Sequence, residues 1–136
     1  MRMHGAFFII LVATSAPLVA QEQAFDPDGP QIFQLVCAMC HSVNPPPKAA
    51  PPMSHVAGHY RQKYPEGEAA IAAMVEYLKK PEAERSALPP HAIERFGLMP
   101  AQSHLSDALL KKVAHYAMSL ADTAHMMGPA AQHQGH

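Results

Sequence analysis

The run Cys37-Ala38-Met39-Cys40-His41 constrains this 136-residue chain more than any other stretch. Residues three and four apart on a helical segment lie on one face, so both cysteines can reach the edge of the same ligand. His41 follows directly and can approach that ligand from the same side. This spacing is the attachment signature of c-type haem, whose iron is ligated by the histidine. The sequence therefore predicts one haem c, bound covalently through Cys37 and Cys40, with His41 on the iron.

Zinc sites and redox dithiols also use a pair of cysteines two residues apart. Zinc would normally need a second pair of Cys or His ligands, and His55 and His59 are the nearest pair at helical spacing. A thioredoxin-like dithiol would lie in alternating strands and helices, and the chain has no strand-like Val/Ile runs of that kind. Haem attachment remains the leading interpretation.

The first twenty residues have the features of a secretory signal peptide. Arg2 gives a basic start, residues 7–13 form an apolar run, and Ala20 offers a small residue at the cleavage point. The apolar run is short for a membrane span, although an uncleaved N-terminal anchor is the alternative. We therefore expect residues 1–20 to be removed, leaving a periplasmic protein with no membrane span in its mature form.

Residues 21–136 are enough for one domain. They carry nine Lys/Arg against eleven Asp/Glu, a net charge of −2, with no basic stripe suited to nucleic acid. The chain contains no Trp, five Phe and four Tyr. So small an aromatic content makes a marginal core, to which a large buried cofactor would add contact area.

Periodic apolar residues predict an all-α fold of about four helices joined by proline-rich loops. A first helix is expected at 29–40, a second at 66–79 and a last one from Ser106, its N-cap, to about Ala121. Shorter helices are expected at 54–64 and at 91–96, the latter stopped by Gly97. The expected buried stripes are Ile71, Met74, Val75 and Leu78 in one helix and Leu109, Val113, Tyr116, Ala117 and Leu120 in the last.

The remaining segments are irregular. Residues 21–28 form a short leader. Residues 44–53 contain five prolines and predict a stiff extended loop, either laid against one face of the haem or serving as an SH3-type ligand or linker. Residues 122–136 lack periodicity and predict a disordered tail, whose His125, His133 and His136 with Met126 and Met127 offer a weaker metal-binding alternative.

With this order of features, residues 29–121 resemble the class I cytochrome c family. Gly29, Phe33 and Cys37 stand four apart, as in the first helix of that family, where the glycine permits close crossing by the last helix. The resemblance makes Tyr116 the aromatic partner of Phe33 at that crossing. It also implies that Pro51, in Ala50-Pro51-Pro52-Met53, orients His41 through its carbonyl group.

The resemblance further implies a methionine as the sixth iron ligand, in a loop before the last helix and followed by proline. Met99-Pro100 fits this description. The alternatives are Met53, a histidine such as His55 or His59, or an open iron site. We expect His91, His104 and His115 to face solvent.

A haem iron with both axial positions filled favours reversible electron transfer without catalysis. The predicted function is therefore that of an exported monohaem electron carrier, free or as the cytochrome subunit of an oxidoreductase. Its partners would be redox proteins, and the chain would be a monomer or a small subunit. The alternative is an enzyme subunit or gas sensor with five-coordinate haem, in which Met99 only packs. Candidate docking charges are Lys48, Arg61, Lys63, Lys79 and Lys80.

Overall fold

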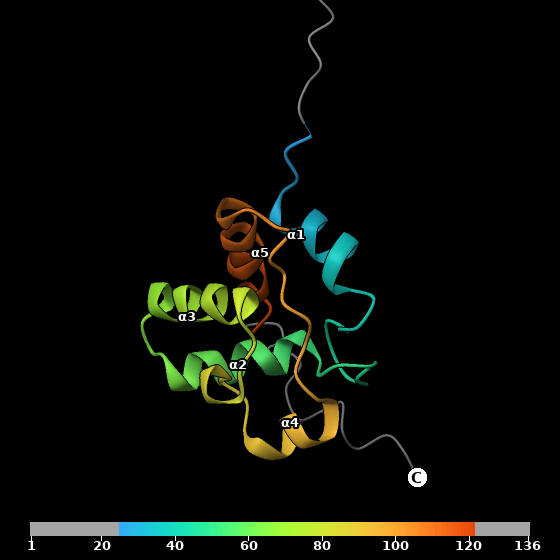
Figure 1. Ribbon diagram of the computed structural model, residues 1–136, viewed down its shortest axis with the longest axis vertical. Coiled ribbons are helices and arrows are strands. Elements are labelled where there is room, and N and C mark those ends of the chain that lie inside the picture. The colour runs from blue at the N-terminus through green and yellow to red at the C-terminus, as the bar shows by residue number, and fades with distance from the viewer. Residues whose placement is uncertain (1–24, 122–136) are drawn as a thin grey trace, which may run out of the picture.

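Helices and loops make up residues 25–121, the part of the chain that the computed structural model describes (Figure 1), and this part contains no strand. The predicted signal peptide, residues 21–24 of the leader and the predicted tail lie outside the described residues. The elements are α1 (Gly29–Ile32), a π-helical turn η1 (Phe33–Cys37), α2 (Met53–Lys63), α3 (Gly67–Lys79), a 3₁₀ turn η2 (Ala83–Arg85), α4 (Pro90–Phe96) and α5 (Asp107–Ser119). The all-α prediction is confirmed.

The first helix, defined here as α1 and η1 together, starts at a capping box. The Asp28 side chain accepts from the Gln31 backbone N–H and the Gln31 side chain accepts from the Asp28 backbone N–H, each at 2.9 Å. Pro30 occupies the first turn, where its missing N–H costs nothing. The start at Gly29 is therefore as predicted.

The end of the first helix differs from the prediction. The Ala38 N–H bonds the Phe33 carbonyl oxygen at 2.9 Å, a π-type bond that spans five residues instead of four. Helical structure ends at Cys37, and residues 38–40 form a separate turn. The prediction of one helix through residue 40 was wrong because the apolar spacing does not distinguish a continued α-helix from a wide turn followed by a tight one.

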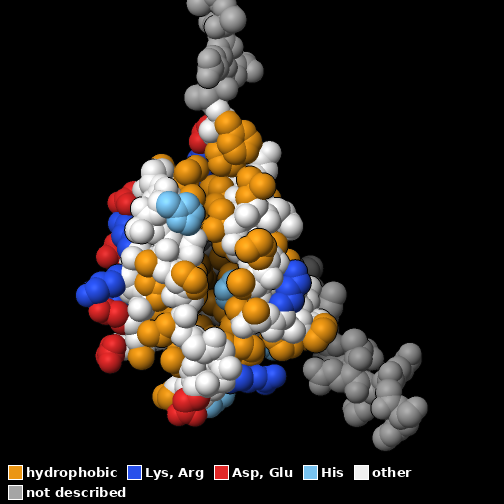
Figure 2. All heavy atoms as spheres, turned by 45° about the vertical axis from the view of Figure 1, so that its right-hand side comes forward, with side chains coloured by type: hydrophobic (Ala, Val, Ile, Leu, Met, Phe, Trp, Pro, Cys, Tyr) orange, Lys and Arg blue, Asp and Glu red, His pale blue; other side chains and the backbone are white. Residues whose placement is uncertain are grey.

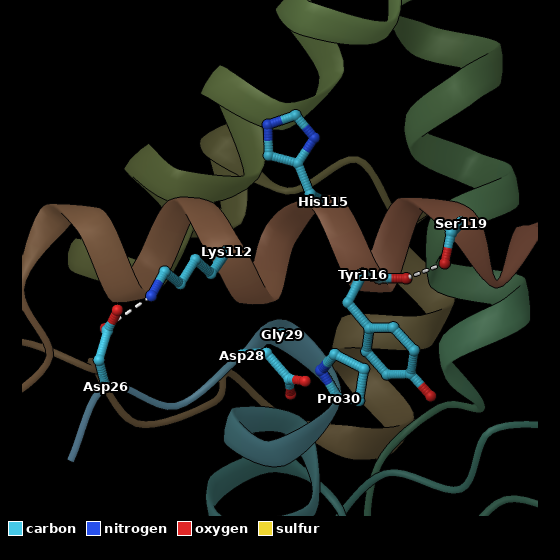
Figure 3. A pocket seen from close by; sticks show the side chains of 8 residues that line it. All are labelled: Asp26, Asp28, Gly29, Pro30, Lys112, His115, Tyr116 and Ser119. Carbon is cyan, nitrogen blue, oxygen red and sulfur yellow. Dashed lines mark hydrogen bonds and ion pairs between the residues drawn. The ribbon is translucent and has the colours of Figure 1, made fainter.

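The first helix crosses α5 at very short range (Figure 3). Gly29 is buried, and a Cβ atom placed on it would lie 2.6 Å from the Lys112 carbonyl oxygen and 2.8 Å from Tyr116 Cβ. One turn further on, the rings of Phe33 and Tyr116 meet edge to face with centroids 5.5 Å apart. Lys112 also forms an ion pair with Asp26 at 2.6 Å. The crossing expected from Gly29, Phe33 and Tyr116 is confirmed.

The helix α5 lies at the centre of the core, because it packs against the first helix, α2 and α3. Since three helices pack against it, its buried face is broader than the predicted stripe. Leu110, Ala114 and Met118 are buried, whereas Leu109 and Tyr116 are only partly covered. In α3, Ile71, Met74 and Leu78 are buried as predicted, whereas Val75 is only partly buried and Tyr77 is buried as well. Along residues 25–121 no helix has both the length and the apolar character needed to cross a membrane.

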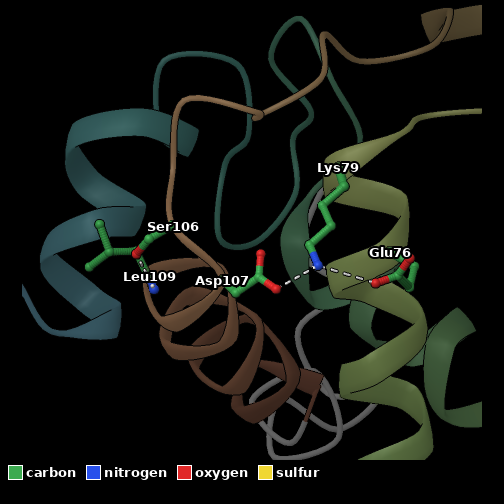
Figure 4. A network of polar contacts seen from close by, with 5 residues as sticks. All are labelled: Glu76, Lys79, Ser106, Asp107 and Leu109. Atoms are coloured by element: carbon green, nitrogen blue, oxygen red, sulfur yellow. Dashed lines mark hydrogen bonds and ion pairs between the residues drawn. The ribbon is translucent and has the colours of Figure 1, made fainter.

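The last two helices are bounded as the sequence indicated. Gly97 ends α4 with a φ of 74°, a conformation that favours glycine. The Ser106 side chain accepts from the Leu109 N–H at the start of α5. Close by, Lys79 forms ion pairs with Glu76 at 3.3 Å and with Asp107 at 2.9 Å, which link the end of α3 to the start of α5 (Figure 4).

We predict that Gly29→Ala destabilises the holoprotein by about 1–3 kcal/mol, the usual cost of overpacking a tight contact. The added methyl group would collide with backbone and Cβ atoms of α5 that cannot move aside separately. The measurement is the free energy of unfolding from denaturant titration followed by far-UV circular dichroism.

The matched control is Gly58→Ala in α2, where a Cβ atom would meet nothing within 4 Å. Alanine is a better helix former than glycine, so the free energy of unfolding of this variant is expected to rise by about 0.5–1 kcal/mol. Equal stability of the two variants would show that the crossing at Gly29 is looser than described.

Candidate functional site

The end of the first helix and the turn after it bring the two cysteines and His41 together. The backbone N–H groups of Cys40 and His41 both donate to the Cys37 carbonyl oxygen, at 3.1 Å and 2.9 Å. Cys37 is partly buried against the core and Cys40 is exposed, and the two cysteines are not joined in a disulfide. This tight turn keeps Cys37, Cys40 and His41 within about one turn of backbone, as the attachment of a single ligand requires.

The side chain of His41 is held by the proline-rich loop. His41 Nδ1 lies 2.7 Å from the Pro51 carbonyl oxygen. A carbonyl oxygen only accepts, so Nδ1 carries the proton and donates, which leaves the lone pair of Nε2 free to ligate a metal. Pro51, which the resemblance implied would orient His41, is thus at hydrogen-bond distance from it. That this bond tunes a bound iron stays a prediction.

The loop itself is closed back on the attachment turn by backbone bonds. The N–H of Ala50 donates to the Cys40 carbonyl oxygen at 3.0 Å, and that of Met53 donates to the Ser42 carbonyl oxygen at 2.8 Å. Lys48 Nζ donates to the Ala38 carbonyl oxygen at 2.7 Å. Because bonds cross the loop at both ends, Pro51 is held at a fixed position beside His41.

Burial sets the protonation of the site. It lowers the pKa of His41, while the bond to the Pro51 carbonyl group raises it by a smaller amount. The neutral imidazole that a metal requires is therefore favoured. Burial, helped by the neighbouring Cys40, raises the pKa of Cys37 to about 11, so that Cys37 is a neutral thiol at physiological pH.

Met99 lies in the loop between α4 and α5, two residues after Gly97. Its side chain is partly buried and packs against the same core cluster as Cys37 and Val43. The loop is fixed to the rest of the fold by Gln102, whose N–H donates to the Leu78 carbonyl oxygen at the end of α3 at 2.8 Å. Sequence reasoning missed this role of Gln102, because a polar loop residue gives no signal of a backbone contact.

The rival ligands occupy different environments. Met53 is buried in the core at the first position of α2. His55, His91, His104 and His115 are exposed, and His59 is partly exposed. The predicted solvent exposure of His91, His104 and His115 is confirmed. Within residues 25–121, no three His, Cys, Asp or Glu side chains gather as a metal-binding set, so the zinc alternative finds no second pair of ligands there.

Two buried hydroxyl groups of α2 have no hydrogen-bond partner among the described protein atoms, Ser54 Oγ and Tyr60 Oη. An unpaired buried hydroxyl costs about 1–3 kcal/mol, which favours a partner such as water or a polar group of a cofactor. Burial, with Tyr77 and Tyr64 as neighbours, raises the pKa of Tyr60, so its hydroxyl group remains a donor. Haem carries two carboxylates that accept such bonds. Together with two thiols and a neutral imidazole, these groups fit haem.

These features describe a small all-helical protein. Two thiols and one imidazole lie close together in residues 37–41, named here the attachment segment, and Met99 lies in a loop between α4 and α5. In a comparison with protein families, the model for cytochrome c matches residues 27–121. The chain belongs to the cytochrome c family, whose members bind haem and transfer electrons. Comparisons with curated proteins and with solved structures gave no significant match.

We predict that Cys40→Ser leaves haem attached through Cys37 alone. The pyridine haemochrome spectrum should then shift to longer wavelength, because one vinyl group stays unsaturated, while mass spectrometry still finds one haem per chain. Met39→Ala, at an exposed position in the same turn, is the control and should keep two thioether bonds. An unshifted haemochrome spectrum in Cys40→Ser would mean that Cys40 takes no part in attachment.

Proposed function

We propose that this protein is an exported monohaem c-type cytochrome that carries single electrons between redox proteins, with His41 and Met99 as the axial ligands of its iron. The observation that carries the proposal is the 2.7 Å contact between His41 Nδ1 and the Pro51 carbonyl oxygen. His41 directly follows the Cys-x-x-Cys pair. When bound, haem supplies a reversible one-electron couple. The protein supplies the side chains that attach the haem, the axial ligands of the iron and the surroundings of both.

His41 would serve as the proximal ligand. The Pro51 carbonyl group fixes its ring in one tautomer. A hydrogen-bond acceptor at the ring nitrogen that does not bind the metal fixes the orientation of the imidazole and increases its basicity. Cys37 and Cys40 would bond the porphyrin covalently, so that the group is retained in both oxidation states. The loop of residues 42–52 keeps this arrangement rigid.

Met99 would serve as the distal ligand. A thioether is a soft ligand that stabilises ferrous iron and raises the reduction potential. The loop position after Gly97, the partial burial and the anchoring by Gln102 support Met99 over Met53, whose side chain lies within the core at the start of α2. With both axial positions filled, no position is left on the metal for a substrate.

The basic and apolar pattern of residues 1–20 supports export to the periplasm, where covalent haem attachment in bacteria takes place. These residues lie outside the described part of the structure. The redox partners are proteins, as for other members of the family.

The proposal predicts a six-coordinate, low-spin haem. The purified protein should show sharp bands when reduced, a weak sulfur-to-iron band when oxidised, and no binding of carbon monoxide at neutral pH. Carbon monoxide binding to the native reduced protein would instead indicate a five-coordinate enzyme subunit or sensor.

We predict that Met99→Ala lowers the reduction potential by at least about 0.1 V, within the span of about 0.8 V that axial ligands set. The same variant should lose the sulfur-to-iron band and bind carbon monoxide. Potentiometric titration and absorption spectra are the measurements. Met53→Leu is the matched control, since it removes a buried thioether while conserving volume, and both properties should be retained. The opposite pattern would make Met53 the ligand.

A further inference from the structure

The exposed side of α2 carries nitrogen donors, unlike the hydrophobic surface that makes up much of Figure 2. In that view, hydrophobic side chains gather on both sides of a vertical hollow and most charged groups lie at the margins. The core side of α2 is apolar, with Val56, Ala57 and Tyr60 buried, whereas His55 is exposed and His59 is partly exposed. The side of α2 away from the core therefore carries two imidazole groups.

The spacing of the two histidines suits a single metal ion. His55 and His59 stand four residues apart, about one turn of an α-helix. Side chains at this spacing share one face, with Cβ atoms about 5–6 Å apart, so one nitrogen of each ring can reach the same ion. Gly58 lies between them in sequence, and a Cβ atom placed on it would meet nothing within 4 Å. The space beside the pair is therefore open to an ion and its water.

Neither ring is engaged in another polar contact. Among residues 25–121, the side chains of His55 and His59 form no hydrogen bond, ion pair or ring contact. The positive charge of Lys63, four residues after His59, is bound to a different part of the fold, because its Nζ atom donates to the Ser86 carbonyl oxygen at 2.8 Å. A nitrogen of each ring is thus available to a ligand from solvent.

The set of donor atoms determines which ion would bind. No Asp or Glu occurs between residues 29 and 65, and in the described part of the chain no third His, Cys, Asp or Glu joins the pair. Calcium and magnesium bind mainly through carboxylate and carbonyl oxygens, which this pair does not supply. Imidazole nitrogen suits zinc, nickel and copper, and copper(II) binds most tightly among the divalent ions of this row.

We propose that His55 and His59 form a surface site for a divalent transition-metal ion, with copper(II) as the preferred ion and water in the remaining coordination positions. The site uses neither of the proposed iron ligands and does not depend on the electron-carrier function. The helix α2 packs against α3 and α5, so both rings stand on a backbone that is already ordered. Such preorganisation reduces the entropy lost on binding.

Two imidazoles on one helix bind an ion more tightly than either does alone. Once the first ring has bound, the second is held at a high effective concentration, and such linkage raises affinity by about 10²–10⁴-fold where both can act together. Loss of either ring should therefore weaken copper binding by at least about tenfold. Loss of a single histidine elsewhere on the surface should leave the affinity of the pair unchanged.

The test is equilibrium dialysis of the exported holoprotein against copper(II) at neutral pH, with the iron kept ferric so that it cannot reduce the copper. The electron paramagnetic resonance spectrum of the wild type should show copper coupled to two nitrogens. His55→Ala and His59→Ala should each lose that signal and bind copper at least about tenfold more weakly. The control is His91→Ala, which removes an exposed ring from α4 and should bind copper like the wild type.

A second control keeps the number of histidines and changes their spacing. His59→Ala combined with Gln62→His, an exposed position of α2, places the rings seven residues and about 10.5 Å apart along the helix axis. Two rings that far apart cannot share one ion, so this double variant should bind copper as weakly as His55→Ala. Tight binding by the double variant would show that histidine content, not the pair, determines copper binding.

Histidines in residues 122–136 are the rival site. The triple variant His125→Ala, His133→Ala, His136→Ala should keep the two-nitrogen copper signal. Loss of that signal in the triple variant, or unchanged affinity in both His55→Ala and His59→Ala, would overturn the proposal.

The absorption spectrum of every variant is recorded before copper is added. Loss of the sulfur-to-iron band in His55→Ala or His59→Ala would refute the copper site, because that side chain would then be needed at the iron. Absence of this band in the wild type would refute the proposed iron ligation. Normal spectra with weak copper binding by the wild type would refute only the metal site on α2.

Discussion

The close approach of the first helix to α5 at Gly29 is the contact on which the rest of the site depends. Because no side chain separates the two backbones there, the ring of Phe33 can meet Tyr116 and the helix can pass on toward Cys37 while still touching the core. The helix α5 in turn packs on α2 and α3. The attachment segment is therefore positioned by helix packing that involves none of the proposed iron ligands.

A second constraint acts on the loop after the first helix. The chain leaves the attachment turn, runs through the prolines and returns so that Pro51 meets His41 at 2.7 Å. Prolines reduce the freedom of this loop before folding, and the backbone bonds from Ala50 and Met53 then fix its two ends. The side chain of His41 is thus oriented by main-chain atoms, which no substitution of a neighbouring side chain removes directly.

The distribution of charge complements this arrangement. The segments that carry the proposed attachment residues and Met99 are almost free of charged side chains, since Lys48 is the only Asp, Glu, Lys or Arg between residues 29 and 60 and none lies between 96 and 106. A low-charge environment leaves ligand type and burial as the main determinants of the iron's reduction potential.

The sequence by itself determined the all-α class, and the spacing of Cys37, Cys40 and His41 predicts haem attachment there. The resemblance to a family, rather than physics, indicated the crossing at Gly29 and the roles of Pro51 and Met99. Only the tertiary structure decided that the first helix ends at Cys37, that Leu110 and Tyr77 are buried where Leu109 and Val75 were expected, and that Gln102 fixes the Met99 loop. These features depend on which neighbours surround each element, and helix periodicity records only that one side is apolar, not how many helices pack against it.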